Sequence, residues 1–287
     1  MAKRKRATTR SSIIRKIKEK RGQGQGIHYK PWLTIHDVPS IGLASRIKGW
    51  KTGRIHHLFS EHLETAYFYM CEWSQSTTDI REQFPLLPLE KTLHIAETLG
   101  IRHPKDPNTR EPIVMTTDFM LTVKTEQGME YWAHTVKPKS KLTKRTLEKF
   151  EIERRFFADE GVKWRLITED DIQYNLVKNV MWIHSARRLI GMNHLNENII
   201  NEIEEELFVA FMNRVKPCAK VAAECDRKFG LPIGSCLFIL RHLLANKRWL
   251  VDMNIRINPA LEPIQISWAN NNILGAVMKN NEQRAGN

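Results

Sequence analysis

Residues 115–123 (MTTDFMLTV) and 131–137 (YWAHTVK) decide the fold of the first part of the chain. Both segments are rich in apolar, β-branched and aromatic residues, which favours β-strands. The intervening residues 126–128 (EQG) are typical of a turn, so the two segments predict a β-hairpin. An α/β fold with a mixed sheet follows if the neighbouring segments add strands and covering helices.

The predicted hairpin brings Asp118 on one strand beside Thr135 and Lys137 on the next. Side chains alternate between the two faces of a strand, so we expect Thr135 and Lys137 on one face and Val136 on the other. Upstream, residues 60–68 (SEHLETAYF) predict a helix that can supply a second carboxylate, Glu64.

Two carboxylates and a lysine on such a scaffold are the outline of a metal-dependent nuclease. Glu64 and Asp118 would hold a hard divalent cation, and Lys137 would polarise the attacking water or neutralise phosphate charge. Taken alone, Glu64 would be an ordinary solvated helix acid. Only its combination with Asp118 and Lys137 makes it a candidate site residue.

Net charge points to a nucleic-acid partner. The 287-residue chain has a formal charge of +13, and residues 1–30 hold eleven Lys or Arg against one acid, which accounts for +10. Such a segment favours DNA contact, with a solubilising tail as the alternative. Residues 46–57 also place basic groups around Trp50, either to contact DNA or as an exposed loop with a packed tryptophan. The candidate DNA-binding residues are Lys3, Arg4, Lys5, Arg6, Arg15, Lys16 and Arg54.

Other classes are disfavoured. No window approaches the roughly 20 apolar residues of a membrane span, and no signal-peptide hydrophobic region follows the basic start. The four cysteines, Cys71, Cys218, Cys225 and Cys236, form no CxxC pair, so we expect reduced thiols in a cytoplasmic protein and no zinc site.

The chain has room for two modest domains. We predict a basic arm ending in a flexible Gly-Gln hinge (1–26), an endonuclease domain (27–185) and a winged-helix-like domain (186–287). In the last, two helices around a turn at 230–232 precede a small hairpin of 248–252 with 254–257. Its candidate reading helix holds few basic residues, which favours protein docking over DNA reading.

The motifs Leu63-Glu64, Thr117-Asp118-Phe119 and Val136-Lys137-Pro138 resemble the TnsA family, the endonuclease subunits of heteromeric transposases of Tn-seven-type transposons. Residues 53–60 (GRIHHLFS) and 79–87 (DIREQFPLL) carry the same resemblance. It implies a restriction-endonuclease-like core with Glu64, Asp118 and Lys137 as the catalytic set. Mg²⁺, for which Mn²⁺ can substitute, would be held by Glu64, Asp118 and the backbone carbonyl of Thr135. Relatives commonly have Gln where this chain has Thr135.

The resemblance also implies the function and the partners. The family cuts the 5′ strand of double-stranded DNA at transposon ends, while a DDE-type transposase subunit cuts the 3′ strand. The C-terminal domain would engage a regulatory AAA+ ATPase, and the complex would work in the bacterial cytoplasm on the nucleoid. The alternative is a non-catalytic DNA-binding or adaptor subunit that links the transposase to the ATPase. The intact set Glu64, Asp118 and Lys137 speaks against it, because a decayed site usually loses one of these.

Overall fold

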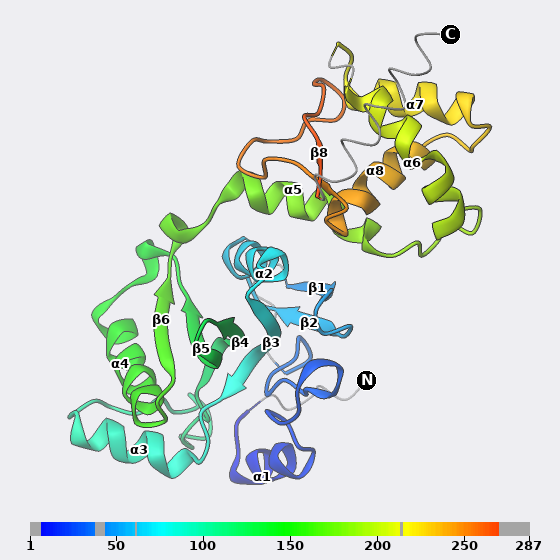
Figure 1. Ribbon diagram of the computed structural model, residues 1–287. Coiled ribbons are helices and arrows are strands. Elements are labelled where there is room, and N and C mark those ends of the chain that lie inside the picture. The colour runs from blue at the N-terminus through cyan, green and yellow to red at the C-terminus, as the bar shows by residue number, and fades with distance from the viewer. Residues whose placement is uncertain (1–6, 38–43, 61, 213–214, 270–287) are drawn as a thin grey trace, which may run out of the picture. The chain divides into compact units, whose positions relative to one another are not determined.

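The computed structural model describes residues 7–37, 44–60, 62–212 and 215–269. The chain divides into two compact units, Met1–Ile172 and Gln173–Asn287 (Figure 1). The division falls before helix α5 (Tyr174–His184), whereas the sequence analysis placed it after residue 185. The reason is that α5 packs on a helix of the second unit, α8 (Ser235–Ala245).

A four-stranded mixed sheet forms the first unit, in the order β3-β4-β5-β6. Its strands are β3 (Thr77–Pro85), β4 (Thr116–Thr125), β5 (Gly128–Val136) and β6 (Lys163–Ile167). The first two pairings are antiparallel and β5–β6 is parallel. The hairpin predicted from the sequence is confirmed as β4–β5. A parallel neighbour requires a crossover, and helix α4 (Lys144–Asp159) makes it.

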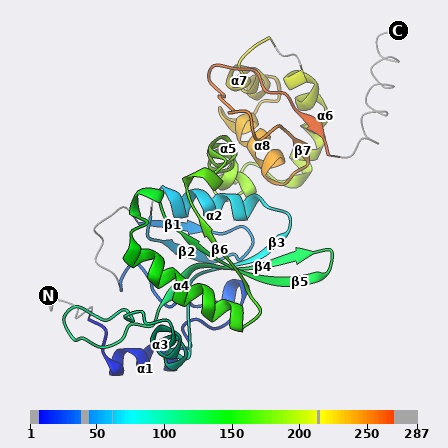
Figure 2. The same cartoon turned by 90° about the vertical axis from the view of Figure 1, so that its left-hand side faces the viewer.

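Alternating residues of the hairpin face different helices. Met120 and Ala133 pack with α4 and α3 (Leu89–Thr98) in a core that includes the fully buried Ile152. Burying one such side chain stabilises the fold by about 1.5–3 kcal/mol. On the other face Tyr67 of α2 (Leu63–Trp73) contacts the rings of Phe119 and His134. The hairpin of β1 (Ser45–Lys48) and β2 (Ile55–Leu58) lies near α2, away from α3 and α4 (Figures 1 and 2).

The N-terminal basic segment packs on the first unit through helix α1 (Arg10–Lys18) and the turn after it. The expected flexible hinge is wrong, because the Gly-Gln repeat is an ordered turn. Gly22 N–H donates to Lys30 O at 2.6 Å and Gly26 N–H to Asp79 Oδ1 at 3.2 Å. Gly24 has φ +91°, and a Cβ there would lie 2.5 Å from a carbonyl oxygen. The glycines therefore permit a tight turn.

The second unit is mainly helical, as the sequence predicts. Besides α5 and α8 it contains α6 (Glu197–Met212), α7 (Cys218–Lys228), and the short strands β7 (Trp249–Leu250) and β8 (Ser267–Trp268). Four 3₁₀ turns complete the described elements of the two units: Gly26–His28, Lys139–Lys141, Glu169–Asp171 and Ser185–Arg187.

The predicted small hairpin of 248–252 with 254–257 is wrong. Trp249 pairs with Trp268 instead. Asn179 of α5 takes up backbone groups that such a hairpin would use: its Nδ2 donates to Met253 O at 3.1 Å and to Ile255 O at 2.7 Å. The winged-helix assignment itself therefore stays a prediction. The expected tail of residues 270–287 lies outside the described residues.

Two further expectations concern the whole chain. All four cysteines are free and buried, which confirms the expectation of unpaired thiols. Among the described residues, no helix combines the length and the hydrophobicity that a membrane crossing requires.

Candidate active site

Asp118 lies at the start of β4, where the β4–β5 ladder ends. The last paired residues are Phe119 and His134. Beyond them, Val136 N–H donates to Asp118 Oδ2 at 2.7 Å, and Gln83 Nε2 donates to Oδ1 at 3.4 Å. These bonds fix the carboxylate at the open end of the hairpin.

Glu64 reaches the same place from the first turn of α2. It is only 9% exposed, and its Oε2 accepts a hydrogen bond from Phe59 N–H at 2.9 Å. A carboxylate in the first turn of a helix is favoured by the helix dipole. A backbone hydrogen bond from Ser60 also lowers the pKa of this carboxyl, so the turn before α2 holds Glu64 in place.

The charges of Glu64, Asp118 and Lys137 act on one another, so the structure brings the three together. Burial, and next the charge of Asp118, raise the pKa of Glu64 to about 8, although Phe59 N–H and Lys137 oppose the shift. Burial also raises the pKa of Asp118 to about 6, opposed by Val136 N–H and by Lys137. Two buried carboxylates with too little neighbouring positive charge resist ionisation together.

This donor set fits a hard divalent cation. A cation between the carboxylates would supply the missing positive charge and favour their ionised forms. Within the described ranges, no group of three or more His, Cys, Asp and Glu forms a ready-made metal cluster. Mg²⁺ suits such a site, because it binds through one or two carboxylates and takes its other oxygens from water and phosphate. Zn²⁺ would require more nitrogen or sulfur ligands.

The Thr135 hydroxyl bonds to the buried Glu153 of α4, not to the two carboxylates of the site. Thr117 Oγ1 and Trp164 Nε1 each lie 3.3 Å from Thr135 Oγ1. The side chain of Thr135 thus points into the interface between the sheet and α4. The proposed role of the Thr135 backbone carbonyl does not depend on where the hydroxyl points.

Glu153 is the residue that sequence reasoning missed. It is 2% exposed, and burial raises its pKa to about 7; hydrogen bonds from Thr135 and Thr117 oppose the shift, and the charge of Asp118 adds to it. Its position between Ile152 and Phe156 on an amphipathic helix was the available signal. A carboxylate on the apolar face of a helix is rare without a partner.

The candidate DNA-binding residues fall into three groups. Lys3, Arg4, Lys5 and Arg6 lie outside the described residues. Arg15 and Lys16 lie on α1; Arg15 is largely exposed, with Glu19 at 3.8 Å, and the Lys16 ammonium lies 5.3 Å from the centre of the Trp32 ring. Arg54 forms the third group and is not free to meet DNA.

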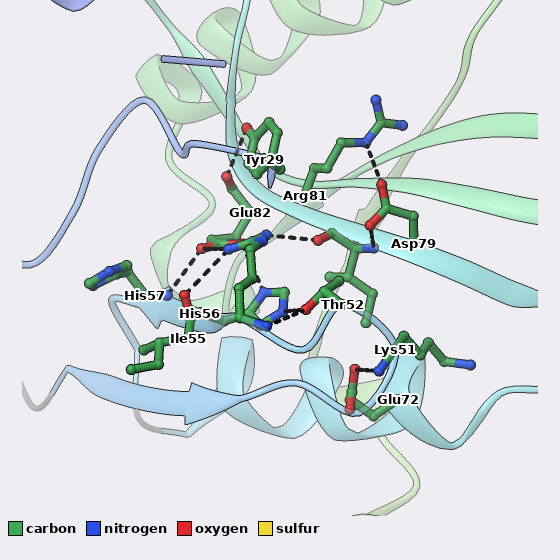
Figure 3. A network of polar contacts seen from close by, with 12 residues as sticks. Tyr29, Lys51, Thr52, Ile55, His56, His57, Glu72, Asp79, Arg81 and Glu82 are labelled. Carbon is green, nitrogen blue, oxygen red and sulfur yellow. Dashed lines mark hydrogen bonds and ion pairs between the residues drawn. The ribbon is translucent and has the colours of Figure 1, made fainter. Parts of the chain in front are cut away.

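Arg54 is buried in a compensated ion-pair network, so its expected role is corrected to a structural one. Its Nη1 donates to Glu82 Oε1 at 2.7 Å and its Nη2 to Ile80 O at 2.8 Å. His56 Nδ1 lies 2.8 Å from the other oxygen of Glu82, and His56 Nε2 lies 2.7 Å from Thr52 Oγ1 (Figure 3). Although burial opposes it, these partners hold the pKa of Glu82 well below its usual range.

A mixed sheet with a buried carboxylate pair and a lysine at the open end of a hairpin is an arrangement typical of nucleases. Family comparisons assign the class. The family model described as "TnsA-like endonuclease N terminal" matches residues 74–169, and "TnsA endonuclease C terminal" matches residues 171–253.

A particular relative supports the same assignment. The chain is 39% identical over 253 residues to "Transposon Tn7 transposition protein TnsA" of Escherichia coli, covering 86% of this chain and 87% of the relative. The chain therefore belongs to the TnsA family of endonucleases, and the resemblance found in the sequence is confirmed.

Proposed function

We propose that this chain is a Mg²⁺-dependent DNA endonuclease that cuts the 5′ strand at transposon ends. The observation that carries the proposal is the buried pair Glu64 and Asp118, which lacks enough internal positive charge and lies beside Lys137. Its family membership supports the nuclease activity. The strand, the metal and the partners go beyond what that membership establishes.

The chemistry is hydrolysis of a phosphodiester. Water attacks phosphorus, one phosphorus–oxygen bond to deoxyribose breaks, and the leaving oxygen gains a proton. A cation held by Glu64 and Asp118 would supply Lewis-acid stabilisation of the charge that develops on the phosphoryl oxygens. Mn²⁺ should substitute for Mg²⁺, because it accepts the same oxygen ligands.

The residues of the chain position the reactants. The bond from Val136 N–H keeps Asp118 at the end of the hairpin, and the bond from Phe59 N–H fixes Glu64 opposite it. Lys137 follows Val136 directly, so the same strand sets its position. Its ammonium would orient the attacking water or neutralise the scissile phosphate. Glu153 supports this end of the sheet through Thr135.

Partners follow from the same proposal. A DDE-type transposase subunit would cut the 3′ strand of the same double-stranded end. The second unit would dock on a regulatory AAA+ ATPase, as its helical build and the few basic residues of its candidate reading helix suggest. The site of action would be the cytoplasm of a bacterium, at the nucleoid.

Strand-specific mapping of nicks on transposon-end DNA tests the proposal. The reaction contains the partner transposase and Mg²⁺, and compares the wild type with Asp118→Asn. A matched control is Asp170→Asn, because Asp170 is an exposed acid that pairs only across the surface with Lys139. We expect 5′-strand nicks with the wild type and the control, and 3′-joined products alone with Asp118→Asn. Nicks in the 5′ strand by folded Asp118→Asn protein would overturn the site assignment.

A further inference from the structure

A basic hollow lies between the loop that precedes β4 and the start of α4. Its volume is about 550 Å³, and among the described residues that line it none is acidic. The hollow also includes His103, whose two ring nitrogens lie within hydrogen-bond distance of Thr92 Oγ1 and Pro104 O. The five Lys and Arg residues that line the hollow are Arg102, Lys105, Arg110, Arg145 and Lys149.

The start of α4 is unusual in its charge. Its first turn contains Lys144 and Arg145 and no acid, although the positive end of a helix dipole disfavours cations by about 0.3–1 kcal/mol. Arg145 pairs with Glu148 at 3.0 Å but also donates to the backbone carbonyl of Arg102. These two contacts hold the guanidinium of Arg145 in the hollow, close to the other basic side chains. Such a concentration of like charge is stabilised when an anion binds it.

The hollow is connected to the candidate active site along one face of α4. Arg145, Lys149 and Glu153 follow one another at intervals of four residues, so they form a row with steps of about 6 Å. Glu153 bonds to Thr135. Lys149 lines the hollow, and besides burial the charges of Arg145 and Lys137 lower its pKa, so the charge of Lys137 reaches this end of the hollow.

The loop that forms the hollow has an ordered structure. Asp106 Oδ1 accepts from Asn108 N–H at 2.9 Å and Thr109 N–H at 3.1 Å, which fixes the turn. Its other oxygen accepts from Thr8 N–H at 2.7 Å, so the start of the described chain lies against this loop (Figure 2).

We propose that this hollow binds the phosphodiester backbone of duplex DNA beside the scissile phosphate, an inference that rests on the nuclease function proposed above. Basic side chains without base-edge readers provide sequence-independent contacts that set the position of the duplex. Arg145 lies about 12 Å along α4 from Glu153. One DNA strand has a phosphate about every 3.4 Å of helix axis, so this distance along α4 spans about three to four phosphates.

The test measures the DNA affinity of the full chain at several salt concentrations, by fluorescence anisotropy with a labelled duplex in EDTA. The test variant is Arg102→Gln/Lys105→Gln, because both side chains are exposed. The control is Lys124→Gln/Lys163→Gln, which removes the same charge at the far ends of β4 and β6 from the site. Thermal unfolding verifies that both variants are folded.

We expect the test variant to bind DNA about tenfold or more weakly. The slope of log affinity against log salt should fall by about 2, since each lost phosphate contact contributes about 0.9. In the control, both the loss of affinity and the change in slope should be less than half of those in the test variant. An unchanged slope in the test variant, or an equal loss of DNA affinity in the control, would overturn the proposal. An acidic protein would then be the partner that the hollow fits.

Binding is measured without cleavage, so the two proposals can fail separately. If the test variant loses DNA affinity but the wild type never nicks transposon-end DNA, the DNA contact is supported and the nuclease function is refuted. A chain that nicks the 5′ strand while the test variant keeps its salt slope would refute the DNA contact alone.

Discussion

Two clusters of buried charge in the first unit differ in one respect. Glu82 is fully buried and has Arg54 and His56 as partners, which hold its pKa well below the usual range. Among the described residues, Lys137 is the positive charge that acts on Glu64 and Asp118, and burial raises the pKa values of both carboxyl groups. A compensated cluster holds segments of the chain together. A cluster of carboxylates with too little positive charge lowers the stability of the fold. A ligand that supplies the missing positive charge explains why such a cluster is present.

The largest expected effect concerns Lys137. Lys137→Ala should lower the rate of 5′-strand cleavage by more than about 10³-fold, or about 4 kcal/mol on the barrier. The fold should not change, because Lys137 follows the end of β5. Single-turnover cleavage measures this. Lys139→Ala is the control, since Lys139 is exposed and pairs with Asp170. Comparable losses in both would indicate a general charge effect.

Breaking the compensated cluster should affect stability. Glu82→Gln leaves the buried Arg54 without its carboxylate, and we expect it to lower the free energy of unfolding by about 3–5 kcal/mol. Glu64→Gln, at the other cluster, should leave stability unchanged or raise it. Urea denaturation of both variants measures the contrast. A stable Glu82→Gln protein, or a strongly destabilised Glu64→Gln protein, would contradict the claim that the Glu82 cluster stabilises the fold and the Glu64 cluster does not.

The pH dependence of stability sharpens the same contrast. The pKa of Glu64 rises from 4.5 to about 8 on folding, so the folded state favours the protonated form. The stability from this group is present at low pH and is lost as the pH rises toward about 8. Without metal, the melting temperature of Glu64→Gln should therefore rise relative to that of the wild type as the pH increases from about 5 to about 8.

The sign reverses for Glu82. Its pKa is lowered on folding, so its contribution is present at neutral pH and is lost only in acid. Mg²⁺ should narrow the gap between the wild type and Glu64→Gln at high pH, because the cation stabilises the ionised pair. A gap that is independent of pH would show that the Glu64 carboxyl is not perturbed.

The smallest effect is expected at Thr135. Thr135→Ala should change the cleavage rate by less than about tenfold, because the backbone carbonyl is kept and the lost hydroxyl bonds to Glu153. Thr135→Gln should likewise be tolerated. Cleavage rate against Mg²⁺ concentration, with circular dichroism to verify folding, measures both. A loss as deep as that of Lys137→Ala would show that the hydroxyl acts in the reaction.

The sequence predicts the features that depend on residues close together in the chain. The hairpin and the placement of Asp118 near Lys137 follow from alternation and a turn, and the helix with Glu64 follows from local periodicity. Arg54 was misjudged because its partner Glu82 lies 28 residues away on another strand. Glu153 was missed because its role arises only when α4 docks on the sheet. The second unit shows the same limit, since Trp249 pairs with Trp268 and not with the next segment.

The central claim is that Glu64 and Asp118 together hold a divalent cation. Mn²⁺ binding, followed by electron paramagnetic resonance of the free ion, tests it directly on the wild type, Asp118→Asn and the control Asp170→Asn. We expect saturable binding to the wild type and the control, strengthening as the pH rises from about 6 to about 8, because the carboxyl groups must ionise first. Asp118→Asn should lose this binding. Equal Mn²⁺ affinity in folded Asp118→Asn and wild-type protein would contradict the claim.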